Sequence, residues 1–83
     1  MRRYIQLTSK TNPISPEVLK ELSRIEGLGD LLSQGANSQG FYIVYYRCSA
    51  PERIEEVCEA MNPWGTAIEC TGEEVSDHRL SLR

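Results

Sequence analysis

Two segments of the chain have the apolar patterns of β-strands. In residues 3–8, Ile5 and Leu7 share one parity while polar or amphipathic residues occupy the other, which predicts a strand with one buried face. Residues 41–47 (FYIVYYR) are aromatic or β-branched at both parities. This composition favours a central strand that is covered on both faces, or one whose tyrosine hydroxyls reach water.

The last part of the chain contains two further alternating segments, residues 66–71 and residues 78–83. Each places an apolar side chain at every second position, which is the period of a strand with one buried face. Acidic residues are frequent in the stretch between them, residues 72–77. We therefore expect an antiparallel hairpin with this stretch as its loop.

A first amphipathic helix is predicted from the three-and-four spacing of apolar residues after residue 15. Ser15 is its expected N-cap and Pro16 its first residue, a position where proline loses only an N–H that has no partner. We expect it to reach about Glu26, where Gly27 and Gly29 end it. Residues 33–40 (SQGANSQG), which follow this helix, have no large apolar side chain. This composition predicts a mobile surface loop.

A second helix is predicted to begin at residues 49–52 (SAPE), where a serine and a glutamate three apart match the capping box. Residues 62–65 (NPWG) end it with a turn. Its buried face is a stripe of four apolar residues, Ile54, Val57, Cys58 and Met61.

These elements follow one another in the order βαβαββ, which we interpret as a single α+β domain over residues 1–83. Each helix lies between two strands, as in a right-handed crossover between parallel neighbours, and each has one apolar stripe. The sequence therefore predicts a two-layer sandwich, in which a four-stranded mixed sheet has both helices on one face and leaves its other face open.

This order of elements is similar to that of the C-terminal domain of bacterial translation initiation factor three and of the sulfur carriers of tRNA thiolation. The carriers have a reactive cysteine in a Cys-Pro-x-Pro sequence at the start of the first helix, where this chain has Asn12-Pro13-Ile14-Ser15-Pro16. The initiation-factor domain binds RNA with a basic surface, whereas this chain has a net charge of −3. We infer neither activity for this chain, since proteins that share one topology have many different functions.

Composition places the chain among folded proteins. Of its 83 residues, 40% are hydrophobic and 25% are charged, an ordinary balance for a globular domain. No stretch approaches the roughly 20 consecutive apolar residues of a membrane span, and no apolar run follows the N-terminal arginines as it does in a signal peptide. We therefore expect a cytoplasmic protein with no membrane partner.

The chain contains three cysteines, Cys48, Cys58 and Cys70. An odd number without close pairs predicts neither a disulfide framework nor a metal site, even with His78 as a fourth ligand. Cys58 and Cys70 lie on apolar stripes and are expected in the core. Cys48 is the candidate reactive thiol, because it precedes a predicted helix start and neighbours Arg47.

The sequence contains no recognisable active site. His78, the only histidine, shares parity with Leu80 and Leu82, which favours a hydrogen-bonded or edge histidine over a general base. Residues 27–29 (GLG) look like a fragment of a phosphate loop, but they lie at a predicted helix end rather than before a helix start. We therefore expect that the protein is not an enzyme and holds no cofactor.

Acidic residues are concentrated between residues 50 and 77, where eight of them accompany a single basic residue, Arg53. Four of the eight are spaced three or four apart on the second helix, without lysine or arginine at the following i+4 positions: Glu52, Glu55, Glu56 and Glu59. Such an acidic stripe is either a solvated helix face or a docking surface for a basic protein. It disfavours direct nucleic-acid binding, which needs clustered lysine and arginine.

We therefore expect a small non-catalytic protein-binding module, a regulator or inhibitor that occludes a basic protein partner such as a nucleic-acid-binding protein. The candidate surfaces are the acidic stripe, Trp64 in its turn, and the open sheet face with Tyr4 and Tyr42. Trp64 either covers the end of the small core or acts as a binding anchor. Two alternatives stay open, a redox or sulfur-transfer protein that uses Cys48 and a small structural subunit of a larger assembly. The sequence does not indicate an oligomeric state.

Overall fold

The computed structural model describes residues 3–82. Its centre is a four-stranded sheet in which neighbouring strands are antiparallel, in the order β2-β3-β1-β4. The strands are β1 (Arg3–Ser9), β2 (Leu28–Ala36), β3 (Tyr42–Cys48) and β4 (Gly65–Cys70). The helices are α1 (Pro16–Leu22), α2 (Ile54–Ala60) and α3 (Gly72–Ser81), with two short 3-10 helices, η1 (Pro51–Arg53) and η2 (Asn62–Trp64). The α+β class is confirmed, whereas the mixed sheet is wrong.

The elements follow the order β1-α1-β2-β3-α2-β4-α3 instead of βαβαββ. β1 and β2 run in the same direction with β3 between them, and β3 and β4 run in the same direction with β1 between them. Each crossover through α1 or α2 therefore passes over one intervening strand, as in the split β-α-β units of ferredoxin-like domains. This topology places β2 and β4 at the two edges of the sheet.

β2 occupies residues that the sequence pattern assigned to a helix end and to the loop at residues 33–40. It is an edge strand, and its pairing with β3 shifts in register between Leu28 and Leu31 and again between Leu31 and Ser33. Bulges of this kind interrupt the alternation by which a strand is recognised in a sequence. The expected loop is therefore wrong up to Ala36, and only the turn that follows it remains outside a strand.

The C-terminal segment forms the helix α3, so the predicted hairpin of residues 66–71 and 78–83 is wrong; its last residue, 83, lies outside the described residues. Thr71 caps α3 through a capping box, in which its Oγ1 accepts from the N–H of Glu74 at 3.2 Å and the Glu74 carboxylate accepts from the N–H of Thr71 at 2.7 Å. The similar SAPE sequence at residues 49–52 forms no such box, since neither η1 nor α2 has a side-chain cap.

The first helix begins as predicted. Ser15 Oγ accepts from the N–H of Val18 at 3.2 Å, and Pro16 is the first helical residue. The helix ends at Leu22, a turn earlier than the expected Glu26. Gly27, with a φ of +92°, then turns the chain toward β2, which is a conformation that glycine adopts without strain.

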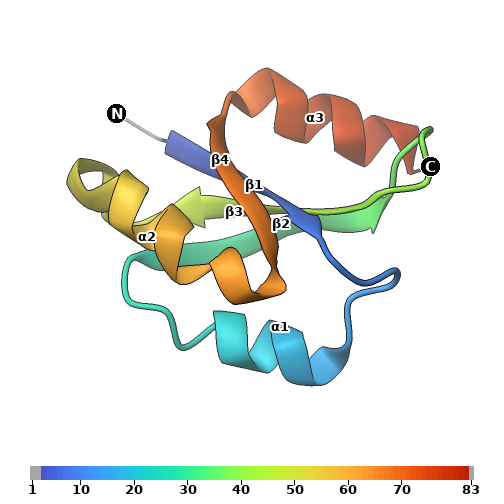
Figure 1. Cartoon of the computed structure of the whole chain (residues 1–83). Coiled ribbons are helices and arrows are strands. Elements are labelled where there is room, and N and C mark those ends of the chain that lie inside the picture. Colours follow the sequence, from blue (N-terminus) through green and yellow to red (C-terminus); the bar gives the residue numbers. More distant parts are fainter. Residues whose placement is uncertain (1–2, 83) are drawn as a thin grey trace.

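The sheet separates two layers of helices, with α1 and α2 on one face and α3 on the other (Figure 1). The larger core lies on the α1 and α2 side, and its most deeply buried members are Ile5, Leu7, Leu22, Val44, Val57 and Met61. A smaller core lies under α3 and is formed by Ile43, Tyr45, Cys70 and Val75. The expected open sheet face is therefore wrong, because α3 packs on it.

The longest helix in residues 3–82 has 10 residues, too few to cross a bilayer.

Candidate functional site

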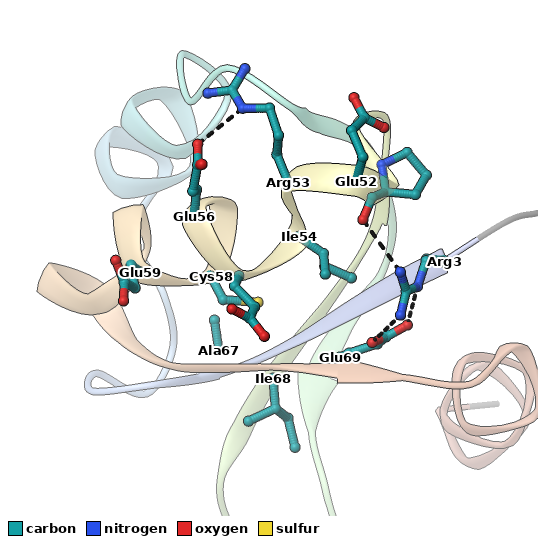
Figure 2. Close-up of a pocket in the computed structure, with 12 residues that line it drawn as sticks. Arg3, Glu52, Arg53, Ile54, Glu56, Cys58, Glu59, Ala67, Ile68 and Glu69 are labelled. Atoms are coloured by element: carbon teal, nitrogen blue, oxygen red, sulfur yellow. Dashed lines mark hydrogen bonds and ion pairs between the residues drawn. The ribbon is translucent and has the colours of Figure 1, made fainter.

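A groove of about 770 Å³ lies between α2 and the edge strand β4. One wall is formed by η1 and the outer side of α2, and the other by residues 67–69 of β4. Figure 2 shows acidic side chains from both walls at this groove. Its carboxylates come from the four glutamates of the predicted stripe and from one on β4: Glu52, Glu55, Glu56, Glu59 and Glu69.

The buried stripe of α2 explains why its glutamates line the groove. Ile54 and Val57 are buried against the sheet, and Met61 at the end of the helix is fully buried. Because residues three and four apart share a helix face, the intervening glutamates are directed away from this core. The positions predicted to form one acidic surface therefore do lie together.

Arg3 closes one end of the groove. Its guanidinium donates two hydrogen bonds to the Glu69 carboxylate, one of them 2.9 Å from Nη2 to Oε1, and a third of 3.4 Å to the carbonyl oxygen of Pro51. The hydrogen bonds that Arg3 donates to Glu69 are the main reason that the pKa of Arg3 is raised. Arg3 thus links β1, β4 and η1 at this end (Figure 2).

Arg53 neutralises part of the acidic stripe. Its Nε lies 3.0 Å from Glu56 Oε2, and its Nη1 lies 3.4 Å from Glu26 Oε1. These two carboxylates raise the pKa of Arg53, with the hydrogen bond to Glu56 as the largest cause. Within residues 3–82, Glu52, Glu55 and Glu59 form no ion pair. The lining therefore has five glutamates and two arginines, and both arginines already have carboxylate partners.

Cys58 lies at the base of the groove and is half-buried. Burial is the largest cause of the increase in its pKa, which keeps the thiol protonated near neutral pH. Among the described residues, the groove contains no histidine or lysine that could act as a base beside this thiol. The lining is thus mainly acidic, and among the described residues it lacks the base that a nucleophilic thiol site needs.

The aromatic residues proposed for partner binding do not line the groove. Trp64 is half-buried against the larger core, and its carbonyl oxygen accepts from the N–H of Lys10 at 3.0 Å. Tyr42 also packs on that core and donates to Gln34 Oε1 at 3.0 Å. Tyr4 lies on the opposite face, against the smaller core. None of these three residues lines the acidic groove, and Tyr4 lies on the face of the sheet opposite to the other two.

The other two cysteines are buried at separate places. Cys48 is only 4% exposed, and its thiol is directed at the carbonyl oxygen of Gly27 at 3.7 Å. Burial raises the pKa of Cys70 to about 12. Within residues 3–82, no three histidine, cysteine or acidic side chains come close enough together to hold a metal ion.

His78 lies in a contact that the sequence pattern did not indicate. It is 7% exposed on α3, where its Nδ1 lies 2.6 Å from Ser33 Oγ and its Nε2 lies 3.2 Å from the carbonyl oxygen of Gly35. Because a carbonyl oxygen only accepts, Nε2 carries the proton in this arrangement and Nδ1 accepts from Ser33. His78 therefore attaches α3 to β2, and its expected place on a strand is wrong.

Sequence reasoning also missed the contribution of β4 to the groove. Ile68 is 52% exposed at the sheet edge, and Glu69 adds a carboxylate that does not belong to the helix. The predicted hairpin would give this strand a partner on its outer side, so neither the exposed Ile68 nor the edge position of the strand is expected from it. The T-x-x-E signal at residues 71–74 could have revealed the error, since it marks the start of a helix.

Comparison with models of known protein families, with curated proteins and with solved structures finds no match for this chain. The split β-α-β topology also carries no function by itself, because many unrelated activities share it. The groove and its side chains are therefore the features that bear on function.

Proposed function

We propose that the protein is a non-catalytic protein-binding module whose acidic groove receives a basic segment of a partner protein. The observation that carries this proposal is the convergence of five glutamates from three elements on one groove, three of them without an ion pair in residues 3–82. A surface of one sign attracts and orients a partner of the opposite sign. Occupation of that partner's basic surface makes the protein a regulator or inhibitor by occlusion.

The same charges weigh against direct binding of nucleic acid. Phosphate groups would meet the groove glutamates as like charges, whereas a nucleic-acid-binding protein offers lysine and arginine side chains of the opposite charge. The burial of Cys48 weighs against the thiol alternative, because a reactive thiol needs access and a stabilised thiolate. The alternative of a structural subunit has no comparable feature in its favour.

A pair of charge-reversal variants tests the proposal. Glu55 and Glu59 are exposed, lie four residues apart on α2 and have no ion pair within residues 3–82, so Glu55→Lys/Glu59→Lys changes the groove with little effect on the fold. Glu73→Lys/Asp77→Lys is the matched control, because these residues have the same spacing and exposure on α3. Both variants change the net charge equally.

Wild type and both variants are used to capture proteins from the native host, and the affinity of each captured protein is then measured at low and high salt. We expect one basic protein to bind wild type and the control alike and to bind the groove variant at least about tenfold more weakly at low salt. The difference should shrink as salt rises, because ions screen exposed charges. Equal binding to the groove variant and the control at low salt would sink the proposal.

A further inference from the structure

The groove borders a sheet edge that is suited to accept another strand. β4 is the last strand of the sheet and pairs with β1 on its inner side; no strand among residues 3–82 pairs with its outer side. The outward N–H and C=O groups of an edge strand can bond to an added chain. The acidic surface and the strand edge are adjacent, since residues 67–69 belong to both.

The two edges of the sheet differ in regularity. β2 shifts register twice along its pairing with β3, at Leu28/Leu31 and at Leu31/Ser33. β4 pairs with β1 without a shift from Tyr4↔Cys70 to Ser9↔Gly65. A bulged edge twists and loses its even spacing of donors and acceptors, whereas a regular one keeps it. Of the two edges, β4 is therefore the better template for strand addition.

The two sides of β4 present different chemistry. Ala67 packs toward the larger core and Glu69 is bound to Arg3, both on the α2 side. Side chains alternate along a strand, so Ile68 is directed to the other side, as Figure 2 shows. Ile68 remains 52% exposed there, because the smaller core under α3 does not include it.

We propose that the partner's basic segment binds as an extended strand along the outer edge of β4. This inference rests on the proposed function and specifies its binding mode. The side chains of an added strand would project alternately to the two sides of the sheet. Those on the α2 side meet the groove glutamates, and those on the other side meet Ile68 and Thr66. The favoured segment therefore alternates lysine or arginine with β-branched apolar residues.

Charge identifies the occupant as a different protein. A second copy of this chain on the same edge would bring two sets of groove glutamates together, and like charges at close range oppose association. A basic extended segment instead supplies a cation to the glutamates that have no ion pair within residues 3–82. Main-chain hydrogen bonds to β4 add affinity that depends little on which side chains the partner segment carries.

Backbone-methylated peptides test the binding mode without altering the protein. The probe is a short peptide of alternating lysine and valine, and two derivatives carry N-methyl groups either on all lysines or on all valines. In a strand, the N–H groups of one parity face the neighbouring strand and those of the other parity face away. We expect one derivative to bind about tenfold more weakly or worse, and the other to bind like the parent peptide.

Two further measurements on wild type and variants complete the test. Amide hydrogen exchange should slow at outward-facing N–H groups of β4 when the parent peptide binds, and Ile68→Lys should weaken binding while its fold stays intact. Equal loss for both methylated derivatives, or no binding of the parent peptide at low salt, would overturn strand addition. If the peptide instead binds Glu55→Lys/Glu59→Lys as well as wild type, the acidic groove itself is not the binding surface and the proposed function fails.

Discussion

Ser33 and His78 lie 45 residues apart in the chain, yet Oγ of Ser33 is 2.6 Å from Nδ1 of His78. Both residues are buried, and the second ring nitrogen of His78 bonds to the carbonyl oxygen of Gly35. The ring also lies at a tilt to that of Tyr45, with the centroids 4.9 Å apart. These contacts hold the last helix, α3, against β2 and β3.

Replacement of Ser33 by alanine should therefore destabilise the protein. The change leaves Nδ1 of His78 buried without a donor, which costs about 1–3 kcal/mol. Urea unfolding followed by circular dichroism gives the free energy of unfolding. Ser38→Ala is the control, because Ser38 is exposed in the turn between β2 and β3, and it should unfold like wild type. Equal unfolding midpoints for both variants would show that the Ser33 contact contributes nothing.

This contact could not be predicted from the sequence because both of its elements were misassigned. The sequence of β2 predicts a helix end and a loop, since its bulges break the alternating pattern and residues 33–36 have no large apolar side chain. The sequence of α3 predicts a loop and a strand, because Leu80 and Leu82 alternate over a stretch too short to distinguish the strand period from the helix period. Local signals such as the Ser15 cap, by contrast, were interpreted correctly.

The sequence predicts one part of the candidate site, the glutamates of α2, and does not predict the other part, Glu69 and Arg3. The glutamates of α2 share a surface because of helical spacing, which a sequence shows directly. Glu69 and Arg3 reach that surface only because β1 and β4 pair, and their contact spans 66 residues of chain. A pairing between distant strands depends on the whole topology, and the missed strand β2 made the expected topology wrong.

Asn37 should stabilise the turn that joins β2 to β3. Its Oδ1 accepts hydrogen bonds of 3.0 Å from the N–H groups of both Gln39 and Phe41. Asn37→Ala removes both bonds at a partly buried position and should cost about 1 kcal/mol. Amide exchange should become faster at Phe41, which loses its acceptor. The adjacent substitution Ser38→Ala leaves these bonds in place, and comparable exchange rates in the two variants would contradict this account.

Gly65 should tolerate no side chain, because β4 begins there in close contact with β1. A Cβ atom at this position would clash with the carbonyl oxygen of Thr8, a backbone atom that cannot move aside without breaking the strand pairing. We expect Gly65→Ala to destabilise by roughly 1–3 kcal/mol or to prevent folding.

Gly40→Ala provides the comparison for this substitution. A Cβ atom at Gly40 meets nothing within 4 Å, so its cost comes only from the positive φ of +86°. That cost is about 1–2 kcal/mol. Thermal unfolding of both variants measures the difference, and a smaller loss for Gly65→Ala than for Gly40→Ala would show that β1 and β4 can separate at this point.

Alkaline pH should weaken the fold through Cys70. Burial raises its pKa from the ordinary 9.0 to about 12, so the folded state holds the proton more tightly than the unfolded state. The stabilisation is fully present below pH 9 and is lost as pH rises toward about 12, because the unfolded thiol ionises first. Tyr46, whose pKa burial also raises to about 12, acts in the same direction above pH 10.

Urea unfolding of wild type and Cys70→Ala across this pH range checks the sign. The variant should be less stable than wild type near neutral pH, where it lacks a buried side chain, and should lose stability less steeply as pH rises. Tyrosinate absorbance reports the ionisation of Tyr46 separately. Parallel pH curves for the two proteins would show that ionisation of Cys70 is not linked to unfolding.

The contrast between the two sheet edges sets a limit on assembly. A sheet that offers a regular template on both sides can grow in both directions, and repeated pairing of that kind leads to fibrils. Here the register shifts of β2 disfavour growth at one side, and the glutamates beside β4 oppose a second copy at the other. If a basic segment binds as we propose, strand pairing at β4 should stop after one segment, and the expected stoichiometry is one to one.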